Sequence, residues 1–160
     1  MKQLLDSYEK DKQMIKGFLE KTKNRDEEYL FGELCFCLLT PQSRAFAARK
    51  AIEKLKQDKK LFTATQEELR KYLTGVRFPE KKVEYLLKAR SMFPEIKSRL
   101  NLNPVEFRDW LAENIMGFGL KEASHFLRNI GIGFGHVGIM DVHVQNFMKN
   151  NKMFSNNSKS

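Results

Sequence analysis

Apolar residues recur every three or four positions along nearly the whole chain, a spacing that predicts helices and leaves no segment with strand-like alternation. Residues 2–22 are expected to form a basic amphipathic helix, since their apolar positions lie among many lysines. Further helices are expected at residues 27–39, 43–56 (with Phe46, Ile52 and Leu55 facing inward), 65–72, 79–92, 103–115, 121–130 and 141–150. The pattern therefore predicts an all-α, multi-helix domain of about eight or nine helices.

Local signals support several of these helix ends. Asn103 followed by Pro104 is the clearest start, because asparagine caps a helix and proline is tolerated in its first turn. Thr65 with Glu68 has the spacing of a capping box. The four glycines of residues 131–138 predict a loop. We expect one domain over residues 1–150 and a disordered tail over 151–160, which is rich in Asn, Ser and Lys.

The charge of the chain favours an anionic partner. Its 29 Lys and Arg outnumber 20 Asp and Glu, for a formal net charge of +9, which suits a nucleic acid or a membrane surface. No apolar run approaches the roughly 18 residues that cross a membrane, and the N-terminus lacks a signal-peptide core. Cys35 and Cys37, the only cysteines, are too few and too close for a zinc site or a disulfide framework. We therefore expect a cytoplasmic protein with reduced thiols and no membrane partner.

The segment Trp110–Gly131, WLAENIMGFGLKEASHFLRNIG, carries the strongest functional signal. Two predicted helices are joined by Gly117-Phe118-Gly119, a turn too short for bulky residues. Glycines leave the backbone N–H groups unshielded, and the N-terminus of the following helix attracts anions. The segment therefore predicts a helical hairpin that binds phosphate.

Two charged residues flank this hairpin and the glycine loop. Lys121 falls in the first turn of the second helix, where the helix dipole disfavours a protonated amine and so favours a nucleophilic one. It could equally be a solvated lysine or a phosphate contact. Asp141 follows an apolar pair at the start of a helix, where it could be a plain N-cap, a carboxylate partner for Lys121, or both.

Three motifs in order give the chain a specific resemblance. They are FCLLTPQSRA at residues 36–45, GVRFPEKK at 75–82 and GLKEASHFLRNIG at 119–131. With the later aspartate, they resemble the helix-hairpin-helix (HhH-GPD) DNA glycosylases, in particular the second 8-oxoguanine DNA glycosylase/AP lyase family of archaea and bacteria. The resemblance covers roughly residues 25–148.

This resemblance implies base-excision repair of double-stranded DNA containing 8-oxoguanine or an abasic site, by a monomer without a cofactor. Lys121 would attack C1′, displace the damaged base and form a Schiff base, after which the 3′ phosphate leaves by β-elimination. Asp141 would stabilise the cationic transition state and help deprotonate Lys121. Such an enzyme must flip its target base out of the duplex, and it would act within the cell at the nucleoid.

The resemblance also assigns DNA contacts. Phe78 is the candidate for stacking on the flipped base, and Gln42 and Ser43 for filling the vacated stack or contacting the orphan base. Gly117 and Gly119 would bind phosphate. By its position one turn after Lys121, His125 could line the rim of the active site or could simply pack and form hydrogen bonds. His143 could likewise contact DNA or have a structural role. Further candidate phosphate contacts are Arg44, Arg77, Lys81, Lys82 and Arg128. Carbonyls of Glu113, Ile115 and Phe118 could hold a monovalent cation, with no metal in the chemistry.

Alternatives remain open from the sequence alone. A non-catalytic helix-hairpin-helix module that binds DNA, or an impaired and truncated glycosylase, would keep the hairpin. A relative with another lesion preference would keep the chemistry. Two departures matter: Val142 replaces the basic residue usual after the aspartate, and the family continues beyond this sequence into a C-terminal segment that contributes to base recognition. GFGHVG at residues 133–138 lacks the flanking strand of a dinucleotide site, and four clustered cysteines of an iron–sulfur branch are absent.

Overall fold

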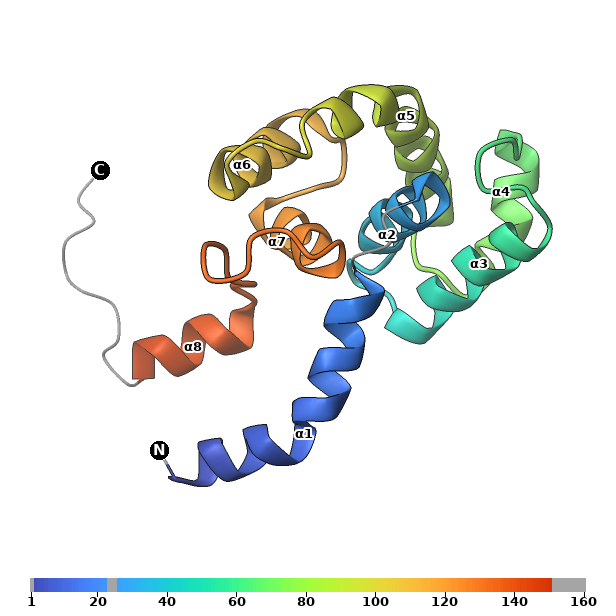
Figure 1. Ribbon diagram of the computed structural model, residues 1–160. Coiled ribbons are helices and arrows are strands. Elements are labelled where there is room, and N and C mark those ends of the chain that lie inside the picture. Colours follow the sequence, from blue (N-terminus) through green and yellow to red (C-terminus); the bar gives the residue numbers. More distant parts are fainter. Residues whose placement is uncertain (1, 23–25, 151–160) are drawn as a thin grey trace.

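A computed structural model describes residues 2–22 and 26–150 of the chain (Figure 1). Its eight helices are α1 (Lys2–Lys21), α2 (Glu27–Leu39), α3 (Ala45–Gln57), α4 (Gln66–Tyr72), α5 (Pro79–Ser98), α6 (Pro104–Asn114), α7 (Leu120–Asn129) and α8 (Val142–Asn150). All regular elements in these ranges are helices, which confirms the all-α prediction. The predicted tail at 151–160 lies outside the described residues.

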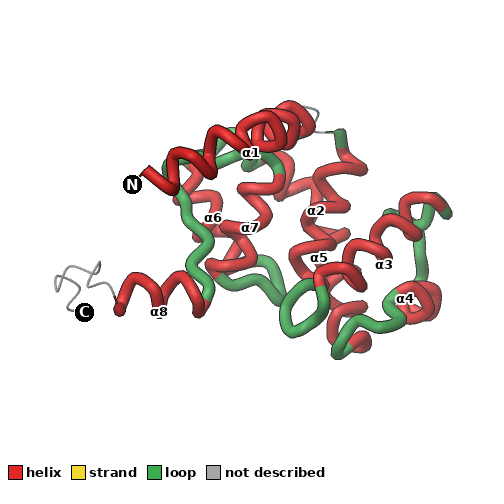
Figure 2. The backbone as a smooth tube through the Cα atoms, turned by 90° about the horizontal axis from the view of Figure 1, so that it is seen from below, coloured by secondary structure: helices red, strands yellow, loops and turns green. Residues whose placement is uncertain are grey.

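Helix α2 is the centre of the fold. The Asp26 side chain caps it by accepting the Tyr29 N–H at 2.7 Å. Every residue from Leu30 to Leu39 is buried, so this helix has no solvent face after its first turn. It packs against α3, α5 and α7, and Figure 2 shows it between these neighbours. The apolar run of residues 30–39 is therefore the core around which the functional elements are arranged.

Helices α6 and α7 form the predicted hairpin pair and pack closely together. The side chain of Asn103 accepts the Val105 N–H at 2.9 Å and caps α6, as expected from the Asn-Pro signal. Ala123, Phe126 and Leu127 bury one face of α7 against the core, which leaves its first turn at the surface.

Helix α5 corrects one predicted boundary. We expected it to end near Met92, but it continues to Ser98 with Pro94 inside it. An internal proline lacks the N–H of a helical hydrogen bond and ordinarily destabilises a helix by about 3 kcal/mol. Here Phe93 and Ile96 are almost fully buried on either side of the exposed Pro94. Tertiary burial therefore outweighs the local signal.

Helix α3 corrects a second prediction. Its buried face consists of Ala48, Ala51, Ile52 and Leu55, which recur with helical spacing. Phe46 stands outside that register and is 78% exposed, so the expectation that it faces inward is wrong. The helix also begins at Ala45 rather than 43, which leaves residues 40–44 as a loop.

Helices α1 and α8 lie at the periphery, where Figure 1 shows them extending away from the other helices. No residue of α8 is buried. In α1, the predicted apolar positions Leu5, Tyr8 and Ile15 remain at least partly exposed, at 58%, 47% and 38%. The predicted helix is confirmed, although these side chains do not join the core. Among the residues described, no helix combines the length and apolar character that crossing a membrane requires.

Candidate active site

The glycine hairpin between α6 and α7 approaches α5 more closely than a side chain would allow. Gly117 has φ +90°, and a Cβ placed on it would lie 2.5 Å from the Tyr85 ring. The next residue, Phe118, is buried and donates its N–H to the Ile115 carbonyl at 3.0 Å. Gly119 returns the chain to an extended conformation and precedes the first turn of α7. Gly117 is therefore required by the tight hairpin, whereas Gly119 has a backbone conformation that any residue can adopt.

Lys121 projects from the first turn of α7 with 48% of its side chain exposed. Its Nζ lies 3.3 Å from one carboxylate oxygen of Glu122. The other oxygen accepts the Gly119 N–H at 3.3 Å. We had not predicted a role for Glu122, although glutamate three residues after a helix cap is the signal for this contact. One carboxylate thus links the hairpin backbone to the candidate nucleophile.

Asp141 is the N-cap of α8, because its side chain accepts the Val144 N–H at 2.9 Å. The pKa of this carboxyl group is lowered mainly by that hydrogen bond, then by the His143 N–H and the positive charges of His143 and Lys121. The N-cap role is therefore present in the structure.

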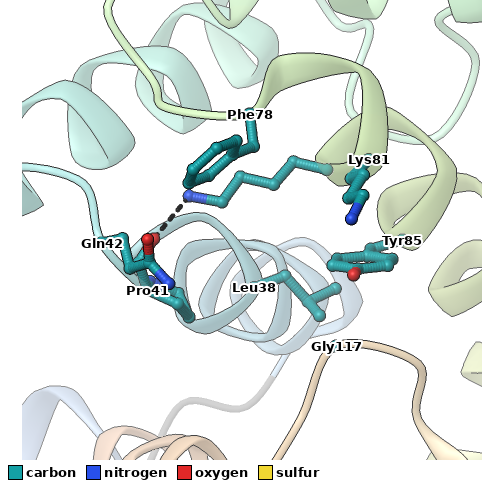
Figure 3. Close-up of a pocket in the computed structure, with 8 residues that line it drawn as sticks. Leu38, Pro41, Gln42, Phe78, Lys81, Tyr85 and Gly117 are labelled. Atoms are coloured by element: carbon teal, nitrogen blue, oxygen red, sulfur yellow. Dashed lines mark hydrogen bonds between the residues drawn. The ribbon is translucent and has the colours of Figure 1, made fainter.

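Gln42 and Phe78 meet in a pocket of about 320 Å³ between the 40–44 loop, α5 and the hairpin (Figure 3). Leu38, Pro41, Gln42, Phe78, Lys81, Lys82, Tyr85 and Gly117 line it. We call this the wedge pocket. Gln42 and Phe78 both have φ +56°, a left-handed conformation that non-glycine residues rarely adopt. Phe78 is 52% exposed, with the Arg77 guanidinium 5.3 Å from its ring centre.

Lys82 lies beneath this pocket and is 4% exposed. Its Nζ donates to the carbonyls of Leu39 at 2.6 Å and Pro41 at 2.8 Å, and to the Ser43 hydroxyl at 2.9 Å; the Pro41 bond is the dashed line in Figure 3. Burial, and secondarily the charge of Arg77, lowers the pKa of Lys82. All three N–H donors are occupied, so this lysine has none left for the phosphate contact we expected.

A second, more open cleft of about 650 Å³ lies between α2, α3 and α7. His125, one turn beyond Lys121, reaches it and meets the Phe36 ring edge-on at 5.8 Å between centres. Desolvation is the main cause that lowers the pKa of His125, followed by the charge of Arg128, with a smaller contribution from Lys121. His143, in contrast, is exposed in the first turn of α8.

A buried carboxylate shapes the wall of this cleft. Glu33 is 6% exposed and accepts hydrogen bonds from Arg49 at 2.5 Å and Asn129 at 2.7 Å. The Arg49 guanidinium also lies 3.8 Å from the centre of the Phe36 ring. We had not predicted this network, although Glu33 is the one acid in the apolar part of α2 and a buried acid needs partners. It ties α2, α3 and α7 together beside His125.

The end of α6 offers the chemistry of a monovalent-cation site. Carbonyls in the last turn of a helix lack helical partners and carry a partial negative charge, as hard cations require. Glu113 belongs to that turn, and the Ile115 carbonyl follows it and uses one lone pair for the Phe118 N–H. The carbonyls of Glu113, Ile115 and Phe118 therefore have the chemistry of a cation site, and a bound cation there stays a prediction. Within residues 2–22 and 26–150, no three His, Cys, Asp or Glu side chains gather as metal ligands.

These features together define the helix-hairpin-helix class of DNA glycosylase folds. The chain belongs to the 8-oxoguanine DNA glycosylase family: the family described as "Ogg-HhH: 8-oxoguanine DNA glycosylase" matches residues 11–160. Two curated relatives are 8-oxoguanine DNA glycosylase/AP lyases. That of Fusobacterium nucleatum is 39% identical over 83% of this chain and 64% of its own length. That of Korarchaeum cryptofilum is 40% identical over 78% of this chain and 60% of its own length. The chain thus spans less than two thirds of these relatives.

Solved structures agree with this assignment. The crystal structure of the 8-oxoguanine DNA glycosylase of Thermotoga maritima matches 99% of this chain and 77% of that chain, with a TM-score of 0.83 and 31% identity. The 8-oxoguanine glycosylase/lyase of Methanocaldococcus jannaschii, in complex with a 15mer DNA containing 8-oxoguanine, matches 99% and 80% with a TM-score of 0.76 and 30% identity. The all-α helix-hairpin-helix fold is therefore shown.

Proposed function

We propose that the protein is a bifunctional 8-oxoguanine DNA glycosylase and AP lyase that acts on double-stranded DNA. One observation carries the proposal: Lys121 is exposed in the first turn of the helix that follows the Gly117-Phe118-Gly119 turn. Its positive charge is also among the causes that lower the pKa of Asp141. A module that only binds phosphate requires neither residue in this arrangement. The curated relatives named as glycosylase/AP lyases and the relative bound to 8-oxoguanine DNA support the same activity.

In the proposed reaction, the neutral Lys121 amine attacks C1′ of the damaged nucleotide. The bond from C1′ to the base breaks, and the base leaves with the bonding electrons and takes up a proton. The attached nitrogen loses one proton, and its lone pair then breaks the bond from C1′ to the ring oxygen, which takes up a proton; the product is an open sugar joined to Lys121 as a protonated Schiff base. Removal of a proton from C2′ then expels the 3′ phosphate, which nicks the strand.

Asp141 is better suited to one of its two predicted tasks. Its lowered pKa makes it a weak proton acceptor. The same hydrogen bonds keep it ionised near Lys121, where a fixed negative charge stabilises a cationic sugar in the transition state. We therefore propose electrostatic stabilisation as its main role.

The two cavities suggest how the duplex is opened. We propose that Gln42 and Phe78 act together as a wedge, since they share one pocket beside the hairpin. Phe78 would then stack on a base that stays in the duplex rather than on the flipped base as we first expected, and Gln42 would enter the vacated position. The extruded base would enter the cleft beside His125 and Phe36, one helical turn from Lys121. Gly117, Gly119 and His143 would contact the DNA backbone around this opening.

Borohydride trapping on a duplex with one 8-oxoguanine tests the proposal. We expect a covalent adduct with damaged DNA, none with undamaged DNA, and none with Lys121→Gln. Lys88→Gln is a closely matched control, because Lys88 is also 3.3 Å from a glutamate and 51% exposed, against 48% for Lys121.

Two other outcomes separate the alternatives. Trapping only on an abasic-site duplex would mean that the lyase is present without recognition of the base. No trapping on either substrate, with DNA binding intact, would leave a binding module. We also propose that a monomer acts on chromosomal DNA inside the cell; sedimentation of the protein on its substrate measures the stoichiometry.

A further inference from the structure

We propose that Lys82 is a positioning residue that locks the two loops carrying Gln42 and Phe78 into one rigid wedge. The inference rests on the proposed function, because the wedge is needed only where a base must be extruded from a duplex. It assigns Lys82 a role beneath the DNA-binding surface rather than on it.

The two wedge residues hold an unfavourable backbone conformation. Gln42 and Phe78 are two of only three non-glycine residues with positive φ in the described part of the chain. Such conformations persist only where surrounding contacts fix them, and they gather at functional sites. Both side chains line the same pocket, so the question is what holds their backbones.

Lys82 contacts both loops. Its Nζ binds the Leu39 and Pro41 carbonyls and the Ser43 hydroxyl, and so brackets Gln42 on both sides. Its backbone N–H donates to the Phe78 carbonyl at 3.1 Å in the first helical hydrogen bond of α5, so the ammonium group is tethered one turn from Phe78. A single residue therefore joins the conformations of both wedge residues.

Ser43 provides a second link between the loops. Its hydroxyl accepts the Arg77 N–H at 2.9 Å as well as the Lys82 Nζ. Arg77 and Lys82, which lie 34 and 39 positions after Ser43 in the sequence, thus both donate to the Ser43 hydroxyl oxygen. We call Lys82 and Ser43, with the Leu39 and Pro41 carbonyls, the Lys82 clamp.

The chemistry of the clamp calls for lysine. An ammonium group has three N–H donors and no acceptor, which matches the three oxygens around it. Methionine has a similar length and volume but would leave those acceptors without their donor. The longer, planar guanidinium of arginine presents its donors as a fork and does not fit three converging oxygens.

The test compares duplex and single-stranded substrates. In Lys82→Met, we expect excision of 8-oxoguanine from a duplex to fall on the order of 10- to 100-fold, since misplaced positioning groups have effects of this size. Trapping on a single-stranded abasic oligonucleotide should change by less than about threefold, because no base has to be extruded from a stack there. Lys88→Met removes an exposed charge from the same helix and should alter neither.

A second readout does not depend on catalysis. A duplex with 2-aminopurine beside the lesion should brighten on binding the wild-type protein and much less on binding Lys82→Met at saturation, because an unwedged duplex stays stacked. Ser43→Ala removes one clamp acceptor and keeps Gln42, so it should show a smaller loss in the same direction. If Lys82→Met does not fold, the Ser43→Ala variant tests the proposal in its place.

Three results would overturn the proposal. Duplex and single-strand activities could fall together, which would indicate general damage to the fold. Alternatively, the duplex and single-strand activities of Lys82→Met could both stay at the wild-type level. Finally, the 2-aminopurine signal could be the same as the wild type in Lys82→Met and in Ser43→Ala. If the wild-type protein neither traps nor nicks DNA, the proposed function fails, whereas the 2-aminopurine measurement still decides the role of the clamp.

Discussion

The wedge pocket and the Lys121–Asp141 pair are built in opposite ways. Gln42 and Phe78 lie over the buried Lys82 and its hydrogen bonds, beside the close contact of Gly117 with the half-buried Tyr85. Lys121 is half exposed, and Asp141 caps a helix in which no residue is buried. The part that would deform DNA is therefore fixed by the core, and the part that would perform chemistry stands at the surface.

This contrast has an energetic consequence. Buried, hydrogen-bonded groups support both the fold and the shape of the site, so changing them should affect stability and activity together. Exposed charges contribute little to stability because solvent screens them. The two regions should thus respond differently to substitution.

The largest expected effect is at the nucleophile. Lys121→Gln should lower strand nicking by at least on the order of 10³-fold, since it removes the amine that would form the Schiff base. Its thermal unfolding midpoint should match that of the wild type. A clear drop in that midpoint would show that Lys121 supports the hairpin and would break the contrast.

A smaller loss is expected at the carboxylate. Asp141→Asn should slow base excision by on the order of 10²- to 10⁴-fold, because the negative charge is lost. Asparagine caps helices as well as aspartate does, so circular dichroism should show α8 retained. Asp141→Ala removes both functions, and equal stability of the two variants would argue against the capping role.

A substitution at Gly117 in the hairpin should mainly lower the stability of the fold. Gly117→Ala would place a Cβ 2.5 Å from Tyr85 at φ +90°, where alanine is strained. We expect the unfolding free energy to fall by about 2 kcal/mol in urea denaturation. Gly138→Ala is the control, because nothing lies within 4 Å of its added Cβ. Equal effects in both would mean that the Tyr85 contact does not constrain the hairpin.

The smallest expected effect is a pH dependence from His125. Its folded pKa is below the ordinary 6.5, so the unfolded chain binds the proton first as the pH falls. The unfolding free energy should therefore decrease as the pH falls through 6.5 toward the folded pKa, and this contribution is fully present only above 6.5. His125→Gln should flatten the slope, whereas the exposed His136→Gln should leave it unchanged.

The sequence by itself determined the helical class and the approximate position of most elements. Helical spacing, the Asn103 cap and the Thr65 capping box are local signals, and the structure confirms each of them. The Gly117-Phe118-Gly119 turn and Lys121 were also readable, because a short turn and the first residues of a helix are fixed by neighbours in the chain. The family motifs then indicated Asp141 as a partner.

Only the tertiary structure decided how distant segments meet. The burial of Phe93 and Ile96 carries α5 past Pro94, against the local preference of proline. A lysine in a basic motif reads as a phosphate contact, yet Lys82 is buried under oxygens from residues 39–43. Glu33 accepts a hydrogen bond from Asn129, which lies 96 positions later in the sequence. Such contacts depend on how the helices pack against one another. The sequence pattern of each helix alone does not encode that packing, so the contacts can be identified only in the folded structure.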